Sequence, residues 1–319
     1  MNKCYVGFDT SNYTTSAAVC NEQGEIVANL KIPLPVKEGN RGLRQSDAVF
    51  EHVRNLPRLM EMLKESLRGY TPVAVGVSAT PRQAEGSYMP CFLSGKAAAN
   101  AFAAAVDCPV YEFSHQDGHV MAAMYSSGGE AHLLSKRRFL AFHVSGGTTE
   151  LLLVEAQDNT QSLKIQLIGE TLDINAGQAI DRVGVSMGLT FPAGPELERL
   201  ATEHCGKLPK KSICVKNGCC SLSGVENIAA KLYGETGDRS LVAAFVFDFI
   251  ERTLAAMCAS AMEKYGDMPV LFAGGVMSNK LMRQGLGKRF DAFFAEPQFS
   301  ADNAAGIALL CRKRATCEK

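Results

Sequence analysis

The stretch LAFHVSGGTTELLLV, residues 140–154, decides how the rest of the chain is interpreted. Phe142 and Val144 lead into a turn, Ser145-Gly-Gly-Thr-Thr149, and a second apolar run follows it. This pattern predicts strand, turn and strand. Adjacent glycines let a ligand come close to the main chain, so the turn's N–H groups and hydroxyls could cradle a phosphate. An ordinary hairpin turn uses the same residues, and both interpretations stay open on this stretch alone.

Two other stretches share features with this one. Residues 4–9, CYVGFD, predict a strand that runs into the hydroxyl-rich turn TSNYTTS, residues 10–16, and a further strand. Two such units about half a chain apart predict two related lobes with a ligand between them. Late in the chain, residues 270–279, VLFAGGVMSN, predict a buried strand that ends in a glycine pair and leads to a helix capped by Ser278 or Asn279.

Bulk composition narrows the class of protein. The 319 residues suffice for one large or two medium domains, and 46% apolar with 21% charged residues is typical of a globular protein. With 33 basic and 33 acidic residues the net charge is zero, so an RNA partner requires a local patch or a second protein. No apolar run reaches membrane-spanning length, no signal peptide is evident and eleven cysteines are scattered. We therefore expect a cytoplasmic protein with reduced thiols and no membrane partner.

A polar link over residues 125–138 predicts the lobe boundary. We expect an N-terminal lobe over residues 1–125 and a C-terminal lobe over residues 126–319, with the final helix free to return to the first lobe. Apolar spacing and cap residues predict helices over residues 47–67, 96–106, 176–189, 196–203, 240–265 and 304–311. Pro57 within the first of these predicts a kink or a break.

Two histidines stand out at the start of another expected helix. Ser114 is a natural N-cap, and His115 and His119, four residues apart, share one helix face. Two histidines at this spacing can both ligate one metal ion, but the glutamate of a zinc protease motif is missing. Packing at the helix start stays open as the alternative. For His52 we expect a surface or packing role, and for Asp302 alone a helix cap.

In chain order, eight motifs together resemble one family, and each by itself is weak. They are GFDTS at 7–11, HQDGH at 115–119, VSGG at 144–147, GETLD at 169–173, PAGP at 192–195, SLSG at 221–224, AGGV at 273–276 with Asn279, and Asp302-Asn303. The chain resembles, over nearly its whole length, the TsaD family of tRNA threonylcarbamoyl transferases, once called glycoproteases.

The resemblance implies a fold and a function. The fold is the α/β, two-lobed actin-like ATPase fold of sugar kinases, Hsp70 and actin, with duplicated mixed sheets flanked by helices and a central nucleotide cleft. The implied enzyme is an acyltransferase that moves the threonylcarbamoyl group from threonylcarbamoyl-adenylate to the exocyclic amine of the adenosine beside a tRNA anticodon. Its partners would be tRNA and proteins of the threonylcarbamoylation machinery.

The resemblance also implies site residues. A divalent metal, iron or zinc or else magnesium, would be held by His115, His119 and Asp302. An adenine nucleotide or threonylcarbamoyl-adenylate would be held by His143, Val144, Ser145, Gly146, Gly147, Asp181, Gly194, Glu198, Gly274, Gly275 and Asn279. Asp9, Ser11 and Asn12 in the first turn are further candidates, and no catalytic residue is assigned.

The chain departs from the family pattern in the presumed transfer chemistry. Tyr13 and Thr14 stand where the family has an adjacent Asp-Glu pair, Thr148 replaces a histidine, and Ile174 replaces an aspartate. The chain is therefore interpreted as a divergent member. The first hypothesis is the transferase, and the second is a paralogue that binds metal and adenine nucleotide with a regulatory or changed activity. A sugar kinase or ATPase is a third hypothesis, because fold alone does not fix chemistry.

Overall fold

The computed structural model describes residues 1–11, 13–35, 43–157 and 163–317. They form two compact units, which are not contiguous in sequence. The first holds residues 1–126, 156–164 and 298–319, and the second holds residues 127–155 and 165–297. The chain therefore does not divide once at the polar link, and its last helix belongs to the first unit.

The first unit is built on a five-stranded mixed sheet in the order β3-β2-β1-β4-β5. β1 runs antiparallel to β2 and parallel to β4. The strands are β1 Asn2–Asp9, β2 Thr14–Asn21, β3 Ile26–Pro33, β4 Tyr70–Thr80 and β5 Val110–Ser114. Alternation along β1 sends Cys4, Val6 and Phe8 into one apolar cluster and leaves Gly7 on the opposite face.

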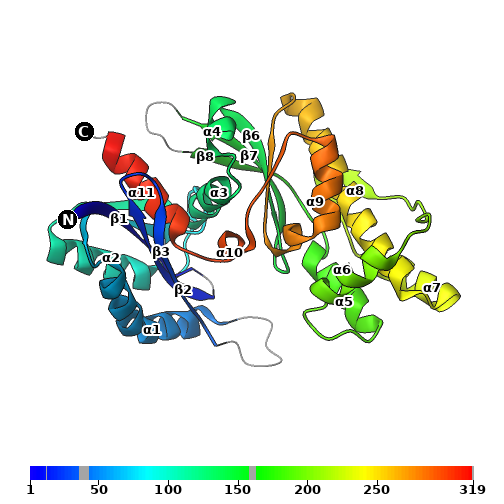
Figure 1. Ribbon diagram of the computed structural model, residues 1–319, viewed down its shortest axis with the longest axis horizontal. Helices are drawn as coiled ribbons and strands as arrows, with labels where there is room; N and C mark the ends of the chain where they lie inside the picture. Colours follow the sequence, from blue (N-terminus) through cyan, green and yellow to red (C-terminus); the bar gives the residue numbers. More distant parts are fainter. Residues whose placement is uncertain (12, 36–42, 158–162, 318–319) are drawn as a thin grey trace. The chain divides into compact units, whose positions relative to one another are not determined.

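Helices cover both faces of this sheet (Figure 1). α1 (Gln45–Ser66) and α2 (Phe92–Val106) pack on the Phe8 face. Of the kink or break predicted at Pro57, the break does not occur, because α1 continues through this residue. α11 (Ala305–Cys317) lies on the other face, against α3 (His115–Ser126). A Cβ at Gly7 would come within 2.5 Å of the Ala308 backbone nitrogen, so only glycine allows α11 to lie this close to β1.

The second unit repeats the strand order of the first. Its sheet runs β12-β11-β6-β7-β8, with β6 antiparallel to β7 and parallel to β11. The strands are β6 Arg138–Val144, β7 Thr149–Ala156, β8 Leu163–Glu170, β11 Val270–Ala273 and β12 Ala292–Phe294. The predicted central hairpin is confirmed. Phe272 stacks between Phe142 and Phe294 at centroid distances of 5.2 and 5.1 Å, which ties the three parallel strands together.

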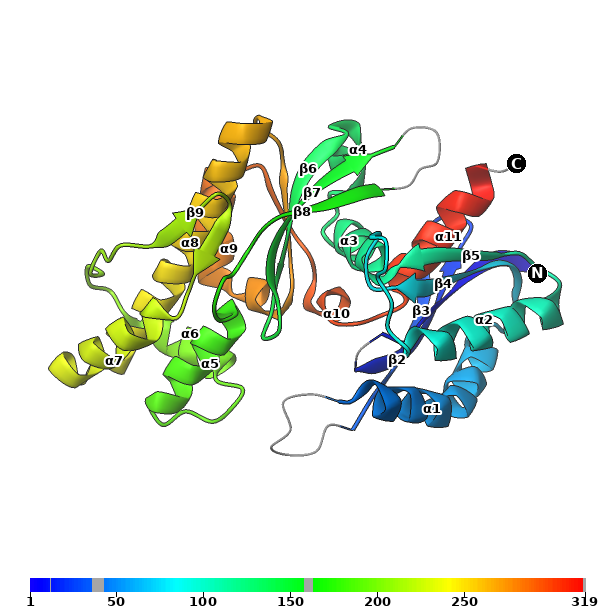
Figure 2. The same ribbon diagram turned by 180° about the vertical axis from the view of Figure 1, so that it is seen from behind.

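Helices pack on this second sheet around a largely buried α8, as Figure 2 shows. The helices are α4 Glu130–Ser135, α5 Ala176–Ser186, α6 Gly194–Glu203, α7 Gly224–Thr236, α8 Arg239–Tyr265 and α9 Lys280–Arg289, with the 3-10 turn η1 Gly275–Ser278 and the hairpin β9 Cys214–Lys216 and β10 Cys219–Ser221. A short helix, α10 (Pro297–Ser300), precedes α11. The two sheets confirm the predicted duplicated α/β architecture. Within the described residues, no helix is both long and apolar enough to span a bilayer.

Candidate functional site

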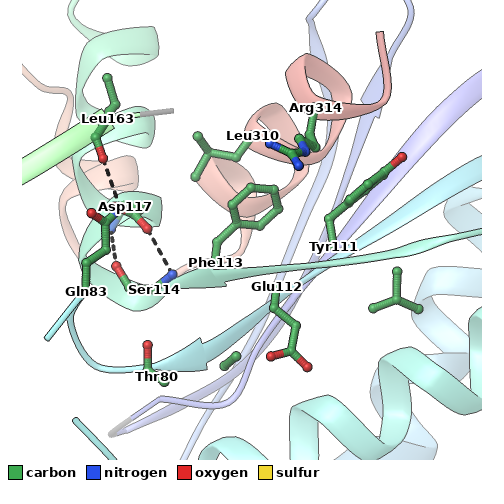
Figure 3. A pocket seen from close by; sticks show the side chains of 12 residues that line it. Thr80, Gln83, Tyr111, Glu112, Phe113, Ser114, Asp117, Leu163, Leu310 and Arg314 are labelled. Atoms are coloured by element: carbon green, nitrogen blue, oxygen red, sulfur yellow. Dashed lines mark hydrogen bonds between the residues drawn. The ribbon is translucent and has the colours of Figure 1, made fainter. Parts of the chain in front are cut away.

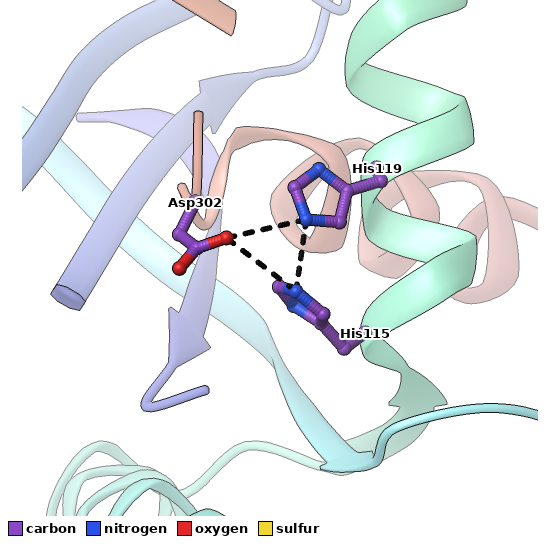
Figure 4. Close-up of side chains that lie close together, drawn as sticks. All are labelled: His115, His119 and Asp302. Atoms are coloured by element: carbon purple, nitrogen blue, oxygen red, sulfur yellow. Dashed lines mark hydrogen bonds and ion pairs between the residues drawn. The ribbon is translucent and has the colours of Figure 1, made fainter. Parts of the chain in front are cut away.

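Three side chains from distant parts of the sequence converge in the first unit (Figure 4). The Nε2 atoms of His115 and His119 lie 2.8 Å apart, and Oδ1 of Asp302 lies 3.6 Å from the first and 3.4 Å from the second. One ligand atom from each of these residues lies within 4.8 Å of the others. Two imidazole nitrogens and one carboxylate oxygen form a donor set that could hold a divalent metal.

Asp9 fixes the orientation of the first histidine. Its Oδ2 lies 2.7 Å from Nδ1 of His115 and also accepts a hydrogen bond from Ser78 Oγ at 2.7 Å, while Oδ1 accepts from the Ser11 N–H at 2.7 Å. Asp9 is only 1% exposed. A carboxylate that accepts from Nδ1–H leaves the Nε2 lone pair of the neutral ring for a metal, as in many carboxylate–histidine–metal arrangements.

Opposite charges and hydrogen bonds stabilise this group of residues. Burial acts to lower the pKa of His115, but the Asp9 charge and hydrogen bond, together with Asp302, raise it to about 9. Burial acts to raise the pKa of Asp302, yet the His119 hydrogen bond and the charges of His115 and His119 hold that pKa well below its usual range. Protonated His115 and the carboxylates of Asp9 and Asp302 therefore stabilise one another.

Local sequence explains why these side chains meet. At the start of α3, Ser114 Oγ accepts from the Asp117 N–H at 3.1 Å and Asp117 Oδ2 accepts from the Ser114 N–H at 3.0 Å, so the predicted cap is confirmed. A Cβ at Gly306 would lie 1.9 Å from the Gly118 carbonyl oxygen. This glycine contact lets the start of α11 lie against α3, which brings the preceding residue Asp302 to the two histidines.

Of the candidates predicted in the first turn, the structure describes Ser11 but not Asn12. Ser11 is fully buried, and its Oγ has no hydrogen-bond partner among the described residues, whereas Asn12 lies outside them. The backbone N–H of Tyr13 donates to Asp302. His52 is fully buried, with Nδ1 2.9 Å from Thr15 Oγ1, and burial lowers its pKa to about 4 against the charges of Asp9 and Asp302. His52 is therefore a packed, neutral residue.

The second unit contains the glycine turn between β6 and β7. His143 and Val144 end β6, and the Ser145 hydroxyl accepts from the N–H groups of Gly147 at 3.2 Å and Thr148 at 3.1 Å. A Cβ built at Gly146 or at Gly147 meets nothing within 4 Å. The backbone at this turn is therefore approachable, as a phosphate loop requires.

The first turn of α5 packs against the same loop. The Gly177 N–H donates to the Ser145 carbonyl at 3.1 Å, and the Ala176 N–H donates to Thr149 Oγ1 at 2.9 Å. A Cβ at Gly177 would come within 2.7 Å of Gly146. A helix amino terminus carries a partial positive charge, so its position beside the loop favours an anionic ligand.

The remaining nucleotide candidates cluster at helix starts in the second unit. Gly274, with φ of +100°, lies against the end of β6: its Cβ would be 2.2 Å from the Val144 carbonyl oxygen. Gly275 has no atom within 4 Å of its built Cβ. Asn279 caps α9 through Oδ1, while its buried Nδ2 has no partner among the described residues.

Two carboxylates link these helix starts. Glu198 Oε1 accepts from the Lys280 N–H at 2.7 Å, which places it beside Asn279. Asp181 Oδ1 accepts from the Ala193 N–H at 2.8 Å, next to Gly194 at the start of α6. The orphaned amide of Asn279 and these acidic groups fit a polar, nucleoside-like ligand, since ribose hydroxyls donate to carboxylates.

Some residues of the first site gave no sequence signal. Ser78 lies in β4, and only the tertiary fold shows that it donates to Asp9. Lys31 lies in an ordinary strand sequence, yet its Nζ donates to the Gln298 carbonyl oxygen at 2.6 Å, on the segment that leads to Asp302. Both contacts join elements that are far apart in sequence, so no local pattern predicts them.

A separate pocket of about 490 Å³ lies beside β5 in the first unit (Figure 3). Tyr111 and Phe113 point to the α11 side of the strand, and Glu112 points to the other side. At its rim, Gln83 Nε2 donates to Asp117 Oδ1 at 2.6 Å and to the Leu163 carbonyl at 2.9 Å. Its lining in the described part of the chain does not include the two histidines or Asp302.

Solved structures define the class of fold. HypF from T. kodakarensis is similar with a TM-score of 0.63 and 12% identity, over 99% of this chain and 48% of that chain, so this chain spans about half of that HypF. The activator of 2-hydroxyisocaproyl-CoA dehydratase from Clostridium difficile with bound ADPNP matches with a TM-score of 0.53 and 13% identity over 98% and 96% of the two chains. A ROK family glucokinase from Streptomyces griseus in complex with glucose and AMPPNP matches with a TM-score of 0.52 and 14% identity over 98% and 99%. These similarities show the actin-like ATPase fold.

Within this fold class, a family sequence model identifies one family. The TsaD model, described as tRNA N6-adenosine threonylcarbamoyltransferase, matches residues 40–309. The chain therefore belongs to the TsaD family, a family of transferases, and the resemblance read from the eight motifs is confirmed.

Proposed function

We propose that the chain is a metal-assisted tRNA adenosine threonylcarbamoyl transferase. The observation that carries this proposal is the convergence of His115, His119 and Asp302, with Asp9 orienting His115. Family membership supports the reaction class, and the donor set supports the metal. Two imidazoles and one carboxylate suit iron or zinc, whereas magnesium prefers an all-oxygen shell.

In the proposed reaction, the exocyclic amine of the tRNA adenosine attacks the carbamoyl carbon of threonylcarbamoyl-adenylate. The new C–N bond forms, the carbon–oxygen bond to the phosphate breaks, AMP leaves, and the amine loses a proton. The bound metal would supply a Lewis acid and a template. His115, His119 and Asp302 would hold it, and Asp9 keeps His115 in the ligating tautomer.

The second unit would bind the nucleotide part of the donor. The backbone at Gly146 and Gly147 is open enough for phosphate oxygens to approach it, and the α5 amino terminus would add a favourable dipole. The Asn279 Nδ2 donor would find its missing acceptor on the nucleoside. Asp181 and Glu198 would accept hydrogen bonds from ribose hydroxyls.

The test is product formation in a purified reaction. We expect wild-type protein with threonylcarbamoyl-adenylate, tRNA and the threonylcarbamoylation partner proteins to form modified adenosine, detected by mass spectrometry of tRNA nucleosides. His115→Ala should reduce product by at least about a hundredfold, because it removes a metal ligand. The matched control His132→Ala removes an exposed histidine paired with Asp291 in the second unit and should leave product unchanged. Metal and nucleotide binding without any transfer would reject the transferase.

A second function is favoured by one specific observation. Tyr13 and Thr14 present no carboxylate where related sequences carry an acidic pair, and the Tyr13 side chain is 45% exposed. The chain would then bind metal and adenine nucleotide with a regulatory or changed activity. In that case Tyr13→Asp combined with Thr14→Glu should create transfer activity, and a fully active wild-type chain would refute this alternative.

A further inference from the structure

A row of polar residues crosses the sheet of the first unit to the metal candidates. In the antiparallel ladders, Asp9 lies directly opposite Ser16, and Ser16 lies directly opposite Lys31. Directly opposed residues share one face of a sheet. Asp9 contacts His115 on that face, so Lys31 stands on the same side of the sheet as the trio of His115, His119 and Asp302.

The Lys31 ammonium faces the segment that carries Asp302. Nζ donates to the Gln298 carbonyl oxygen at 2.6 Å, at the start of α10. The side chain is half-buried, and Asp302 is the acidic group whose charge acts on it. Among the described residues no carboxylate forms an ion pair with Lys31, and the carbonyl uses only one of the three ammonium donors.

Burial of an ammonium group costs free energy, and only an anionic partner offsets this cost fully. A carbonyl oxygen offers a partial charge only. The trio on the same side of the sheet would leave coordination positions of a three-ligand metal open for an oxygen ligand. An oxyanion bound at such a position has further oxygen atoms for a neighbouring cation, and lysine is a common phosphate-binding residue.

We propose that Lys31 is a further ligand-binding residue of the metal candidate site, and that its ammonium binds an oxygen of a phosphate or carboxylate group of the substrate held there. This inference rests on the metal site of the proposed function. It assigns to β3 a part in substrate recognition that no sequence motif of the chain indicates. The alternative is that Lys31 only places Asp302 by holding the Gln298 carbonyl.

The experiment uses the full chain loaded with Co²⁺, whose visible absorption reports ligand changes at the metal. Co²⁺ is titrated first, and inorganic phosphate and acetate are then titrated separately into wild type, Lys31→Met and Lys31→Arg. Lys3→Met is the matched control, because Lys3 is an exposed β1 lysine whose Nζ lies 4.0 Å from the Glu22 carboxylate. Thermal unfolding checks that each variant is folded.

We expect Lys31→Met to bind Co²⁺ within about twofold of wild type and to bind the preferred anion at least about tenfold more weakly, since a charge-assisted hydrogen bond contributes this much. Lys31→Arg should retain most of the affinity, and Lys3→Met should match wild type. If Lys31→Met loses more affinity for inorganic phosphate than for acetate, the recognised group is a phosphate. The reverse result identifies a carboxylate.

Several outcomes would overturn the inference. Equal anion affinity in Lys31→Met and wild type would do so, as would a wild-type Co²⁺ complex that binds neither anion. A parallel loss of Co²⁺ and anion affinity would show that Lys31 only places Asp302. If Lys31→Met folds poorly, Lys31→Gln takes its place in the comparison with wild type and Lys31→Arg. Failure of wild type to bind Co²⁺ would instead reject the metal site of the proposed function, and this inference with it.

Discussion

The same strand order is used in two different ways at corresponding turns. In the first unit the β1–β2 turn follows a buried aspartate that holds a histidine of the metal candidate trio. In the second unit the β6–β7 turn is closed by the Ser145 hydroxyl and leaves Gly146 and Gly147 approachable. The first strand end thus presents a carboxylate side chain, and the second turn presents open backbone.

The difference shows how a repeated fold can present two chemically different sites. A metal requires side-chain ligands in a fixed orientation, and burial of Asp9 with three hydrogen-bond donors provides it. A phosphate requires several N–H groups at close range, which side chains would obstruct. The sheet positions both turns equally well, so only the residues at the strand ends decide which chemistry each unit supports.

The largest expected effect tests Asp9, the buried carboxylate at the end of β1. Asp9→Ala should lower the free energy of unfolding by about 4 kcal/mol, because it leaves the buried donors of His115, Ser78 and Ser11 without their acceptor and removes the charge that stabilises protonated His115. Urea unfolding measures the change. Ser145→Ala, which removes the corresponding acceptor in the second unit, should cost only about 1 kcal/mol. Equal costs for the two variants would break the comparison.

The second effect is a pH dependence of metal-free protein. Because the folded pKa of His115 is raised to about 9 from 6.5, its contribution is fully present below pH 6.5 and is lost as pH rises through 9. In chelator, stability should fall by about 3 kcal/mol across this window. The Asp9 carboxyl, with its lowered pKa, loses its contribution only at acid pH, below about 4.

The pH effect has its own control. His115→Gln cannot titrate in this range, so its stability in urea should change far less between pH 6.5 and 9. A wild-type curve as flat as that of the variant would mean that the Asp9–His115 pair does not carry the charge described here.

The smallest effect tests the close approach of Gly274, which follows β11, to the end of β6. Gly274→Ala should lower the free energy of unfolding by about 2 kcal/mol, because alanine is strained at a φ of +100° and its Cβ would meet the Val144 carbonyl. Gly275→Ala, at an open position, should cost less than about 0.5 kcal/mol. Thermal unfolding of the two variants measures the difference, and similar melting temperatures would show that the close approach of Gly274 is unimportant.

Much of the fold followed from local pattern. The central hairpin, the long helix α8 and the cap of α3 by Ser114 were predicted, since apolar period and cap chemistry act over a few residues. The helix break at Pro57 was wrong, because the packing of α1 on the sheet outweighs the loss of one hydrogen bond. The local sequence did not distinguish metal binding from packing for His115 and His119. Only the family resemblance predicted Asp302 as a third metal ligand.

By itself the sequence determined the two strand–turn–strand units, the α/β class and the family, because short patterns and the order of motifs along the chain carry them. Only the tertiary structure decided that Asp9 and Ser78 stand behind His115 and that Lys31 faces the segment leading to Asp302. Strand register and the glycine contact between α3 and α11 create these neighbours. Both depend on packing between elements separated by many residues, and no short pattern of residues encodes such contacts.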